Sequence, residues 1–318
     1  MLVIGGAGYV GSHAVRALVA AGREVVVLDD LSTGHRAFVP ASVSFIEARL
    51  EDAIDRALDG VDAVMHFAAR SLVEESTRDP QRYFEANCGG ALALARAMIA
   101  RGVSKIVFSS TAAVFGEPVA TPIGDDHPRR PTNPYGMTKM FVEDLLDAYR
   151  VHGLRAVSLR YFNAAGADPS GEIGEHHEPE SHLIPIVLDA ALGRRAGVTV
   201  FGTDYPTRDG TCLRDYVHVC DLADAHVRAL AYLDGGGAPV RLNLGSGTGT
   251  TVREVIASVA RVTEREVPHT DGPRRPGDPS SLVASAAGAE KILGWRPQRG
   301  SIDTIVEDAW RWHRRLRA

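Results

Sequence analysis

The sequence predicts an α/β fold in which a doubly wound parallel sheet is joined to a smaller, mixed α/β region towards the C-terminus. Three observations predict it. Short apolar segments alternate with stretches of helical periodicity in the first half, a glycine-rich turn follows the first apolar segment, and the alternation breaks down after residue 165. Strands that alternate with helices form parallel sheets covered on both faces, because each crossover carries a helix back over the sheet.

The apolar segments of the first half have the length and composition of buried strands, and helical stretches separate them. We expect strands at residues 2–4, 24–30, 61–69, 104–111 and 154–163, and helices at residues 11–22, 81–101 and 136–152. Beyond residue 165, a polar loop that contains glycine and proline leads to an apolar helix at 183–193 and a short strand beginning near residue 198.

The chain then shows signs of a return to the first sheet. A strand and helix at residues 215–233, followed by a strand at 240–247, have the same character as the elements of the first half. We therefore predict a domain over residues 1–165, to which residues 215–246 return, and a smaller second region over residues 166–318.

Composition and charge argue against several classes of partner. Charged residues make up 24% of the 318 and the formal net charge is −5, so we expect neither a nucleic-acid nor a membrane-surface partner. No apolar run approaches the roughly 20 residues of a membrane span. The three cysteines are odd in number and lack framework spacing, which favours unpaired thiols in a reducing compartment. Since no signal-peptide pattern precedes the first strand, we expect a cytoplasmic protein.

The histidines do not predict a metal site. Twelve of them are scattered along the chain without the paired spacing of metal ligands. Two histidines lie among glutamates in the expected loop after residue 165, a group that comprises His176, His177, Glu172, Glu175, Glu178 and Glu180. We expect this group to be an ordinary polar loop, and metal binding is the alternative.

The glycine-rich turn "GGAGYVG" at residues 5–11 places Gly5, Gly8 and Gly11 directly after a strand and at the start of a helix. This context is typical of a Rossmann-type dinucleotide site, where glycines allow a tight turn, a close approach of backbone N–H groups to a pyrophosphate, and close helix packing. Asp29 follows at the end of the next strand, where a carboxylate accepts hydrogen bonds from ribose hydroxyls and repels a 2′-phosphate. The sequence therefore predicts NAD rather than NADP, although a plain tight turn with a turn carboxylate would leave the same pattern.

Tyr135 and Lys139 are four residues apart on one expected helix face, and the strand "FSST" can place Ser110 and Thr111 beside them. A phenol has a pKa near 10, and a nearby ammonium together with an oxidised nicotinamide would favour the phenolate. We therefore predict that Tyr135 acts as an acid–base group, that Lys139 supports it, and that Thr111 or Ser110 binds the substrate hydroxyl. The alternative is an ordinary exposed pair, since residues four apart are neighbours on any helix.

The chain resembles the extended short-chain dehydrogenase/reductase family, and within that family the epimerases of UDP-sugars. The resemblance covers nearly the whole chain. Its segments, in order, are "GGAGYVGSHAVRAL", "HFAARSLVEES", "FSSTAAVFGEP", "NPYGMTK", "LRYFNAAGADPSGEIGE", "FGTDYPTRDGTCLRDYVHVCDLADAH", "LNLGSGTGTTV" and "RRPGDPSSLVAS". The Tyr135–Lys139 spacing marks the whole superfamily, whereas residues 201–219 are far more specific for the epimerases.

The resemblance implies a 4-epimerase that interconverts UDP-galactose and UDP-glucose through a 4-keto intermediate, with NAD as a retained cofactor. It assigns the chemistry to Tyr135, Lys139 and Thr111, and binding of the UDP-sugar to the region 166–318. The residues implied at the NAD site are Gly5, Gly8, Tyr9, Val10, Gly11, Asp29, Asp30, Leu31, Ser32, Thr33, Gly34, Phe67, Ala68, Ala69, Asn87, Ser109, Ser110, Tyr135, Lys139 and Phe162. Those implied at the UDP-sugar site are Thr111, Asn163, His182, Leu183, Val200, Phe201, Arg214, Tyr216, Arg275 and Asp278.

Four positions depart from the family pattern. Arg49 stands where an aspartate usually meets the adenine, His182 replaces an asparagine, and Phe115 replaces a tyrosine. Leu282 occupies the position thought to admit or exclude bulky 2-substituents on the sugar, and its intermediate size leaves the tolerance of N-acetylated sugars open.

Other functions within and outside the superfamily remain alternatives. Dehydratases and decarboxylases of nucleotide sugars need an extra carboxylate just after the catalytic Ser or Thr, where this chain has Ala112 and Ala113. A 4-epimerase of a UDP-N-acetylhexosamine, UDP-pentose or UDP-uronate, or a non-catalytic nucleotide sensor, would share the motifs. The resemblance also implies a homodimer through the helices at 81–101 and 136–152, although a buried face within one chain would equally explain their Ala and Leu content.

Overall fold

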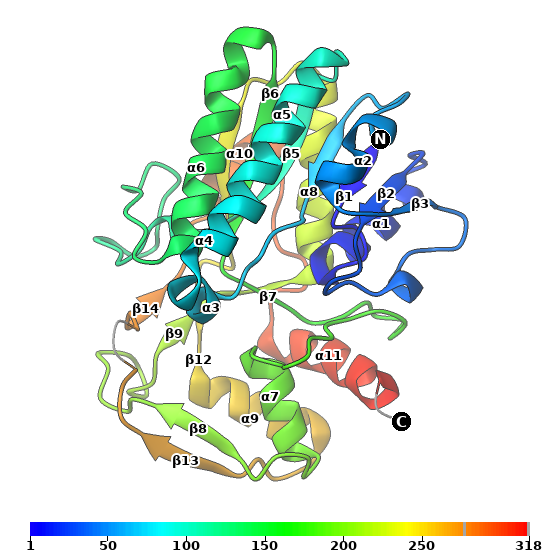
Figure 1. Cartoon of the computed structure of the whole chain (residues 1–318). Coiled ribbons are helices and arrows are strands. Elements are labelled where there is room, and N and C mark those ends of the chain that lie inside the picture. The colour runs from blue at the N-terminus through cyan, green and yellow to red at the C-terminus, as the bar shows by residue number, and fades with distance from the viewer. Residues whose placement is uncertain (276–277, 317–318) are drawn as a thin grey trace.

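The computed structural model of the chain describes residues 1–275 and 278–316, and a seven-stranded parallel sheet lies at its centre (Figure 1). The strand order is β11-β6-β5-β4-β1-β2-β3. In chain order the strands are β1 (Leu2–Ile4), β2 (Val26–Asp29), β3 (Ser44–Glu47), β4 (Val64–His66), β5 (Lys105–Thr111), β6 (Arg155–Tyr161) and β11 (Val240–Leu244). The predicted α/β class with a doubly wound parallel sheet is confirmed.

The strand order reverses beside β1. The chain runs outward from β1 to β2 and β3, and then crosses to place β4 on the other side of β1. Helices leave the sheet in opposite directions at such a reversal, and ligands of open α/β folds bind outside the carboxyl ends of the strands there. The first glycine turn follows β1 and therefore lies at this position.

Helices cover both faces of the sheet. On one face, α1 (Tyr9–Ala20) and α8 (Val219–Asp234) enclose a core that contains Val3, Val15 and Leu230. On the other, α2 (Leu50–Ala57), α5 (Gly90–Ala100) and α6 (Pro134–Ala148) enclose a core that contains Ile4, Leu94 and Leu146. Figure 1 shows α5 and α6 running side by side. The β4–β5 connection also carries α3 (Val73–Arg78).

The expected single helix at 81–101 is interrupted. The chain forms α4 (Pro80–Tyr83), a π-helical turn (Phe84–Gly89) and then α5. Asn87 lies inside this wider turn and hydrogen-bonds to residues outside the helix. These contacts favour a π-helical turn, which holds one extra residue, over the regular hydrogen-bond pattern of an α-helix.

The second region lies below the sheet in Figure 1 and is built from short strands and three helices among the described residues. Their shared core includes Ile184, Val255 and Ile305. The helices are α7 (Leu183–Ala191), α9 (Val252–Thr263) and α11 (Ile302–Leu316), while α10 (Ala287–Leu293) packs beside β11. The strand pairs are β7 (Asn163–Ala165) with β10 (Tyr216–His218), β8 (Val198–Phe201) with β13 (His269–Gly272), and β9 (Leu213–Arg214) with β12 (Thr250–Thr251) and β14 (Ser281–Leu282).

The predicted smaller, mixed C-terminal region is therefore also present. Within residues 1–275 and 278–316, no helix combines the length and apolar character that crossing a membrane requires.

Candidate active site

The glycine turn is shaped by two glycines that no other residue could replace without movement. Gly5 has a φ of +78°, and a Cβ there would lie 2.5 Å from the backbone N of Ala68. A Cβ on Gly11 would lie 2.1 Å from the carbonyl oxygen of Gly5. Gly8 differs, because its added Cβ would meet only an ordinary contact at 3.5 Å, so the protein's own packing does not require glycine there.

Gly8 precedes α1, and no side chain caps the helix at this residue. The first N–H groups of a helix lack partners within the helix and favour an anion. A glycine without a packing requirement, beside an uncapped helix N-terminus, fits the close approach of a pyrophosphate. The turn thus fits the dinucleotide predicted from its sequence.

Asp29 ends β2 and holds the glycine turn in place. Its buried carboxylate accepts hydrogen bonds from the backbone N–H groups of Ala7, at 2.8 Å, and Leu31, at 2.9 Å. Burial raises the pKa of this carboxyl, and the two backbone hydrogen bonds oppose that effect. Each carboxylate oxygen can accept more than one hydrogen bond, so Asp29 retains the capacity to bind ribose hydroxyls.

Other expected cofactor residues follow neighbouring strands. The N–H groups of Phe67 and Ala68, after β4, donate to the carbonyl of Ile4 at 2.8 and 3.1 Å, which brings this segment against the glycine turn. Asp30 accepts hydrogen bonds from the N–H and hydroxyl of Ser32 at 3.0 and 2.6 Å and so shapes the loop after β2, residues 31–34.

Two expected cofactor residues direct their polar groups into the protein. The Asn87 amide accepts from the Arg70 N–H at 2.9 Å and donates to the Arg70 carbonyl at 3.1 Å and the Thr138 hydroxyl at 3.0 Å. The Ser110 hydroxyl donates to Glu143 at 2.7 Å. These contacts support the surrounding elements, and the sequence motifs did not reveal them.

Tyr135 and Lys139 lie on the first turns of α6, beside the end of β5. The helix begins at Pro134 because Asn133 caps it, accepting a hydrogen bond from the Gly136 N–H at 2.8 Å. Asn and Pro are favoured at these two positions of a helix. The cap therefore fixes where the tyrosine enters the helix.

The Lys139 ammonium is buried and donates to the carbonyl of Ser109 at 2.8 Å. It lies 6.0 Å from the centre of the Tyr135 ring and 4.8 Å from that of Phe108. The Thr111 side chain lies close enough to that of Tyr135 to lower its pKa. The structure thus brings together all three residues that the sequence selected for chemistry.

Burial dominates the electrostatics of the pair. Burial raises the pKa of Tyr135 to about 12, and the Thr111 contact lowers it only in part. Burial also lowers the pKa of Lys139 to about 7, against the opposing effect of Glu143. Burial thus favours the neutral form of both groups, and the effect of Lys139 together with an oxidised nicotinamide on the phenol stays a prediction. A further positive charge is needed, and an oxidised nicotinamide would supply it.

The arginines expected to bind a diphosphate lie in the second region. Arg214, on β9, is largely buried and forms an ion pair with Asp278. The guanidinium of Arg275 lies over the Phe201 ring, 4.1 Å from its centre. Planar, permanently charged guanidinium groups suit a diphosphate.

The other expected substrate residues fall into two groups. Asn163, on β7, donates to the carbonyl of Asp215 at 3.0 Å and is partly exposed. Leu183 packs partly buried at the edge of the apolar core of the second region. Val200 and Tyr216 are buried within that core.

His182 precedes α7 and belongs to a cluster with Glu175, His177 and Glu180, whose potential ligand atoms lie within 4.8 Å of one another. Burial would raise the pKa of Glu175, but the two histidines lower it to about 2. Burial would lower the pKa of His177, but its two carboxylate contacts raise it to about 10. Two carboxylates and two imidazolium groups neutralise one another, so the cluster is balanced by its own ion pairs.

The other departures from the family pattern have plain structural settings. The Arg49 side chain is exposed and pairs with Glu51 at 3.6 Å. Phe115 is buried, and Arg160 lies 5.1 Å from the centre of its ring. Leu282 and the expected cofactor residue Phe162 both pack against the apolar cluster that contains Phe115.

Comparison with known proteins agrees with this geometry. Residues 1–245 match the NAD dependent epimerase/dehydratase family. The chain is 50% identical to the UDP-glucose 4-epimerase of Lacticaseibacillus casei, over 98% of this chain and 96% of that protein, and 50% identical to that of Streptomyces lividans, over 98% and 95%.

A solved UDP-glucose 4-epimerase from Brucella ovis, in complex with NAD, superimposes with a TM-score of 0.95 at 44% identity, over 97% of this chain and 96% of that chain. One from Bifidobacterium longum, in complex with NAD⁺ and UDP, gives 0.92 at 35% identity, over 99% and 98%. The match to the family covers well over half of the chain and agrees with the glycine turn and the Tyr135–Lys139 pair, and the chain therefore belongs to the NAD-dependent epimerase/dehydratase family.

Proposed function

We propose that this chain is a UDP-glucose 4-epimerase, which interconverts UDP-galactose and UDP-glucose with retained NAD. The observation that carries the proposal is the arrangement of Tyr135, Lys139 and Thr111 at the end of β5, in a chain half identical to enzymes of that name. The full-length extent of the similarity includes the second region, where a UDP-sugar is expected.

NAD, when bound, supplies the chemistry that the protein lacks, because it accepts a hydride from C4 of the sugar and returns it. The residues that would hold it are those of the glycine turn, Asp29 for the ribose hydroxyls and Lys139 for the nicotinamide ribose. Two features support this fit: no side chain caps the start of α1, and the packing of the protein itself does not require a glycine at Gly8.

Tyr135 accepts the proton from the sugar 4-hydroxyl and later returns it, while Thr111 holds that hydroxyl in line with the phenol. Lys139 is fixed by the Ser109 carbonyl, so its charge acts from a constant position on the phenol. Loss of a proton and a hydride leaves a 4-keto sugar, which must present its other face before C4 regains the hydride and the oxygen regains its proton.

Turnover of the sugar requires that its nucleotide be held while the hexose moves. Arg214 and Arg275 would perform this task, because guanidinium groups can hold a diphosphate without contacting the sugar ring. The paired Asp278 carboxylate would keep Arg214 oriented before substrate binds.

The experiment that tests the function is conversion of UDP-galactose by the purified protein with no cofactor added, followed by chromatography. We expect UDP-glucose to form, since NAD is retained and regenerated in each cycle. No conversion, even with NAD supplied, would reject UDP-hexose as the substrate, and UDP-xylose, UDP-glucuronate and the UDP-N-acetylhexosamines would then be assayed.

We further propose a cytoplasmic homodimer assembled through α5 and α6. Large apolar side chains on these helices and on the turn before α5 are exposed in the single chain, namely Phe84, Leu92, Met137 and Phe141. Phe141→Glu should convert a dimer to a monomer in light scattering, whereas the control Val119→Glu, on an exposed loop, should not. If light scattering shows that the wild-type protein is a monomer, the proposed homodimer is rejected.

A further inference from the structure

Glu143 is a buried carboxylate on the helix that carries Tyr135 and Lys139, yet it has no part in the chemistry described above. It lies one turn beyond Lys139 on α6, and its side chain is 0% exposed. Its Oε1 accepts hydrogen bonds from the hydroxyl of Ser110 and the Nε of Arg160, both at 2.7 Å. Its Oε2 accepts from a second Arg160 nitrogen at 2.7 Å and from Arg129 at 3.2 Å.

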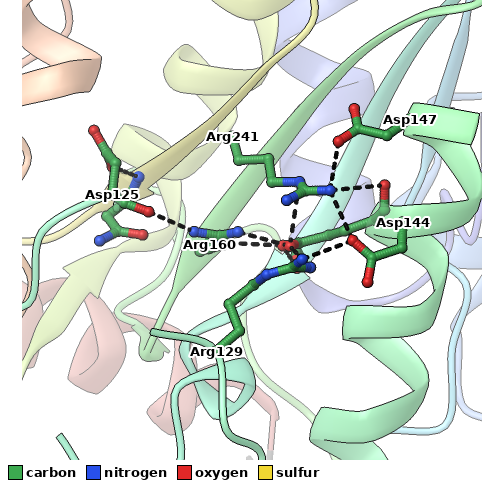
Figure 2. A network of polar contacts seen from close by, with 9 residues as sticks. Asp125, Arg129, Asp144, Asp147, Arg160 and Arg241 are labelled. Atoms are coloured by element: carbon green, nitrogen blue, oxygen red, sulfur yellow. Dashed lines mark hydrogen bonds and ion pairs between the residues drawn. The ribbon is translucent and has the colours of Figure 1, made fainter. Parts of the chain in front are cut away.

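Three guanidinium groups hold this carboxylate in place. Figure 2 shows Arg129, Arg160 and Arg241 converging on one point, with Arg241 Nε 3.6 Å from Glu143. Asp144 and Asp147, on the outer side of α6, balance Arg129 and Arg241 at 2.5 to 2.8 Å. A buried ion pair with this many partners is expensive to form, but it fixes the orientation of each member.

The last three residues of β5 each contact α6 in a different place. The Ser109 carbonyl binds the Lys139 ammonium, the Ser110 hydroxyl binds Glu143, and the Thr111 side chain influences Tyr135. The Ser110–Glu143 bond therefore lies, in the strand, between the two contacts that place the reacting groups.

We propose that Glu143 is a positioning residue, which through Ser110 fixes the end of β5 against α6 and so holds Lys139 and Thr111 in place around Tyr135. The inference rests on the proposed function for the role of Tyr135 as the acid–base group. The effect of Glu143 on the Tyr135 phenol is electrostatic as well as geometric, because a displaced Lys139 ammonium would stabilise a phenolate less well.

Few charged groups compete for influence on the phenol. The other titratable groups that face the pair are His66 on β4 and Tyr161 on β6. Burial lowers the pKa of His66 to about 3 and raises that of Tyr161, so both are neutral at pH 7. Among the described residues, Lys139 is thus the charged group beside Tyr135, and Glu143 with its arginines lies one turn further along α6.

The test uses the holoprotein with Ser110→Ala, which breaks the link and leaves the Glu143–Arg160 pair intact. Replacing Glu143 itself would leave the guanidinium groups of Arg129, Arg160 and Arg241 without their shared carboxylate and could prevent folding. Asp144→Asn is the matched control, because Asp144 binds Arg129 and Arg241 from the exposed side of the same helix. The readout is the pKa of Tyr135 alone, from absorbance at 295 nm of each variant minus the same variant with Tyr135→Phe.

We expect Ser110→Ala to raise the pKa of Tyr135 enough to lower its ionised fraction about threefold, half a pH unit. Its kcat with UDP-galactose should fall about fivefold or more with KM nearly constant, as expected for a role in the transition state. Asp144→Asn should change neither. An unchanged Tyr135 titration in Ser110→Ala would overturn the proposal. If the wild-type protein fails to convert UDP-galactose, the proposed function falls, while the titration, which needs no substrate, still decides the positioning role.

Discussion

The ammonium of Lys139 lies 6.0 Å from the centre of the Tyr135 ring, held there by its hydrogen bond to the Ser109 carbonyl. Four residues of helix place the two side chains on one face, and the strand fixes the charge at a constant distance from the phenol. Burial raises the pKa of Tyr135 to about 12. In the proposed reaction, an additional positive charge is therefore needed to lower that pKa and allow the phenol to act as a base.

Replacing Tyr135 with Phe should remove the acid–base group and keep the ring. We expect kcat to fall about 10²- to 10⁴-fold, the usual contribution of a positioned general base. Bound NAD, measured by absorbance after denaturation, should be unchanged. The control is Tyr149→Phe, on the turn that follows α6, which should retain activity. Full activity in Tyr135→Phe would exclude this residue from the chemistry.

The two glycines Gly8 and Gly11 should respond differently to alanine. In Gly11→Ala the new Cβ would lie 2.1 Å from a backbone oxygen, so we expect destabilisation of about 1–3 kcal/mol or more in thermal unfolding. Gly8→Ala meets only an ordinary contact and should fold normally, yet retain less NAD because its methyl group intrudes where a pyrophosphate is expected. Equal NAD retention by Gly8→Ala and the wild type would argue against a pyrophosphate at this turn.

Arg214→Lys should separate nucleotide binding from chemistry. A lysine keeps the charge and loses the planar pair of donors, so we expect KM for UDP-galactose to rise about tenfold to a hundredfold. The value of kcat should change by no more than a few-fold. Arg253→Lys, which alters an exposed pair with Asp271, serves as the control and should leave KM unchanged. A fall in kcat alone would place Arg214 in the chemical step.

His177 should make the stability of the protein depend on pH on the alkaline side. Its folded pKa, about 10, lies above the unfolded value of 6.5, because its carboxylate contacts outweigh the effect of burial. The stabilisation is therefore complete below pH 6.5 and is lost as the pH rises towards 10.

We expect the difference in Tm between the wild type and His177→Gln, on the order of 2 °C at pH 6, to shrink by pH 10. The comparison with His177→Gln removes the contribution of the titrating groups that do not interact with His177. A difference that stays constant between pH 6 and pH 10 would show that His177 is not a charged partner of Glu175 and Glu180.

Much of the fold and the reacting group could be predicted from the sequence because their signals are local. The glycine spacing follows from a turn of a few residues, and the Tyr135–Lys139 pair from one helical turn. The strands expected in the first half are present, although β2 and β4 are shorter than expected and β3 was not predicted.

The rest depends on contacts between distant residues. In the sequence, Glu143 is one more charged helix residue. Only the fold brings it into contact with Ser110, Arg160 and Arg129, which come from three other segments. The same holds for Glu175, whose partner His182 lies across a loop, and for the π-helical turn at Asn87, which tertiary hydrogen bonds stabilise. Periodicity and spacing carry no information about such contacts.

In the proposed reaction, one hydride leaves the sugar and returns to the same carbon while Tyr135 transfers the proton. The most direct measurement is the conversion of UDP-galactose deuterated at C4, in ordinary water, with the product analysed by mass spectrometry and NMR. We expect UDP-glucose that keeps its deuterium at C4, because the transferred hydride never reaches solvent. Product that has lost the label to solvent would contradict this expectation.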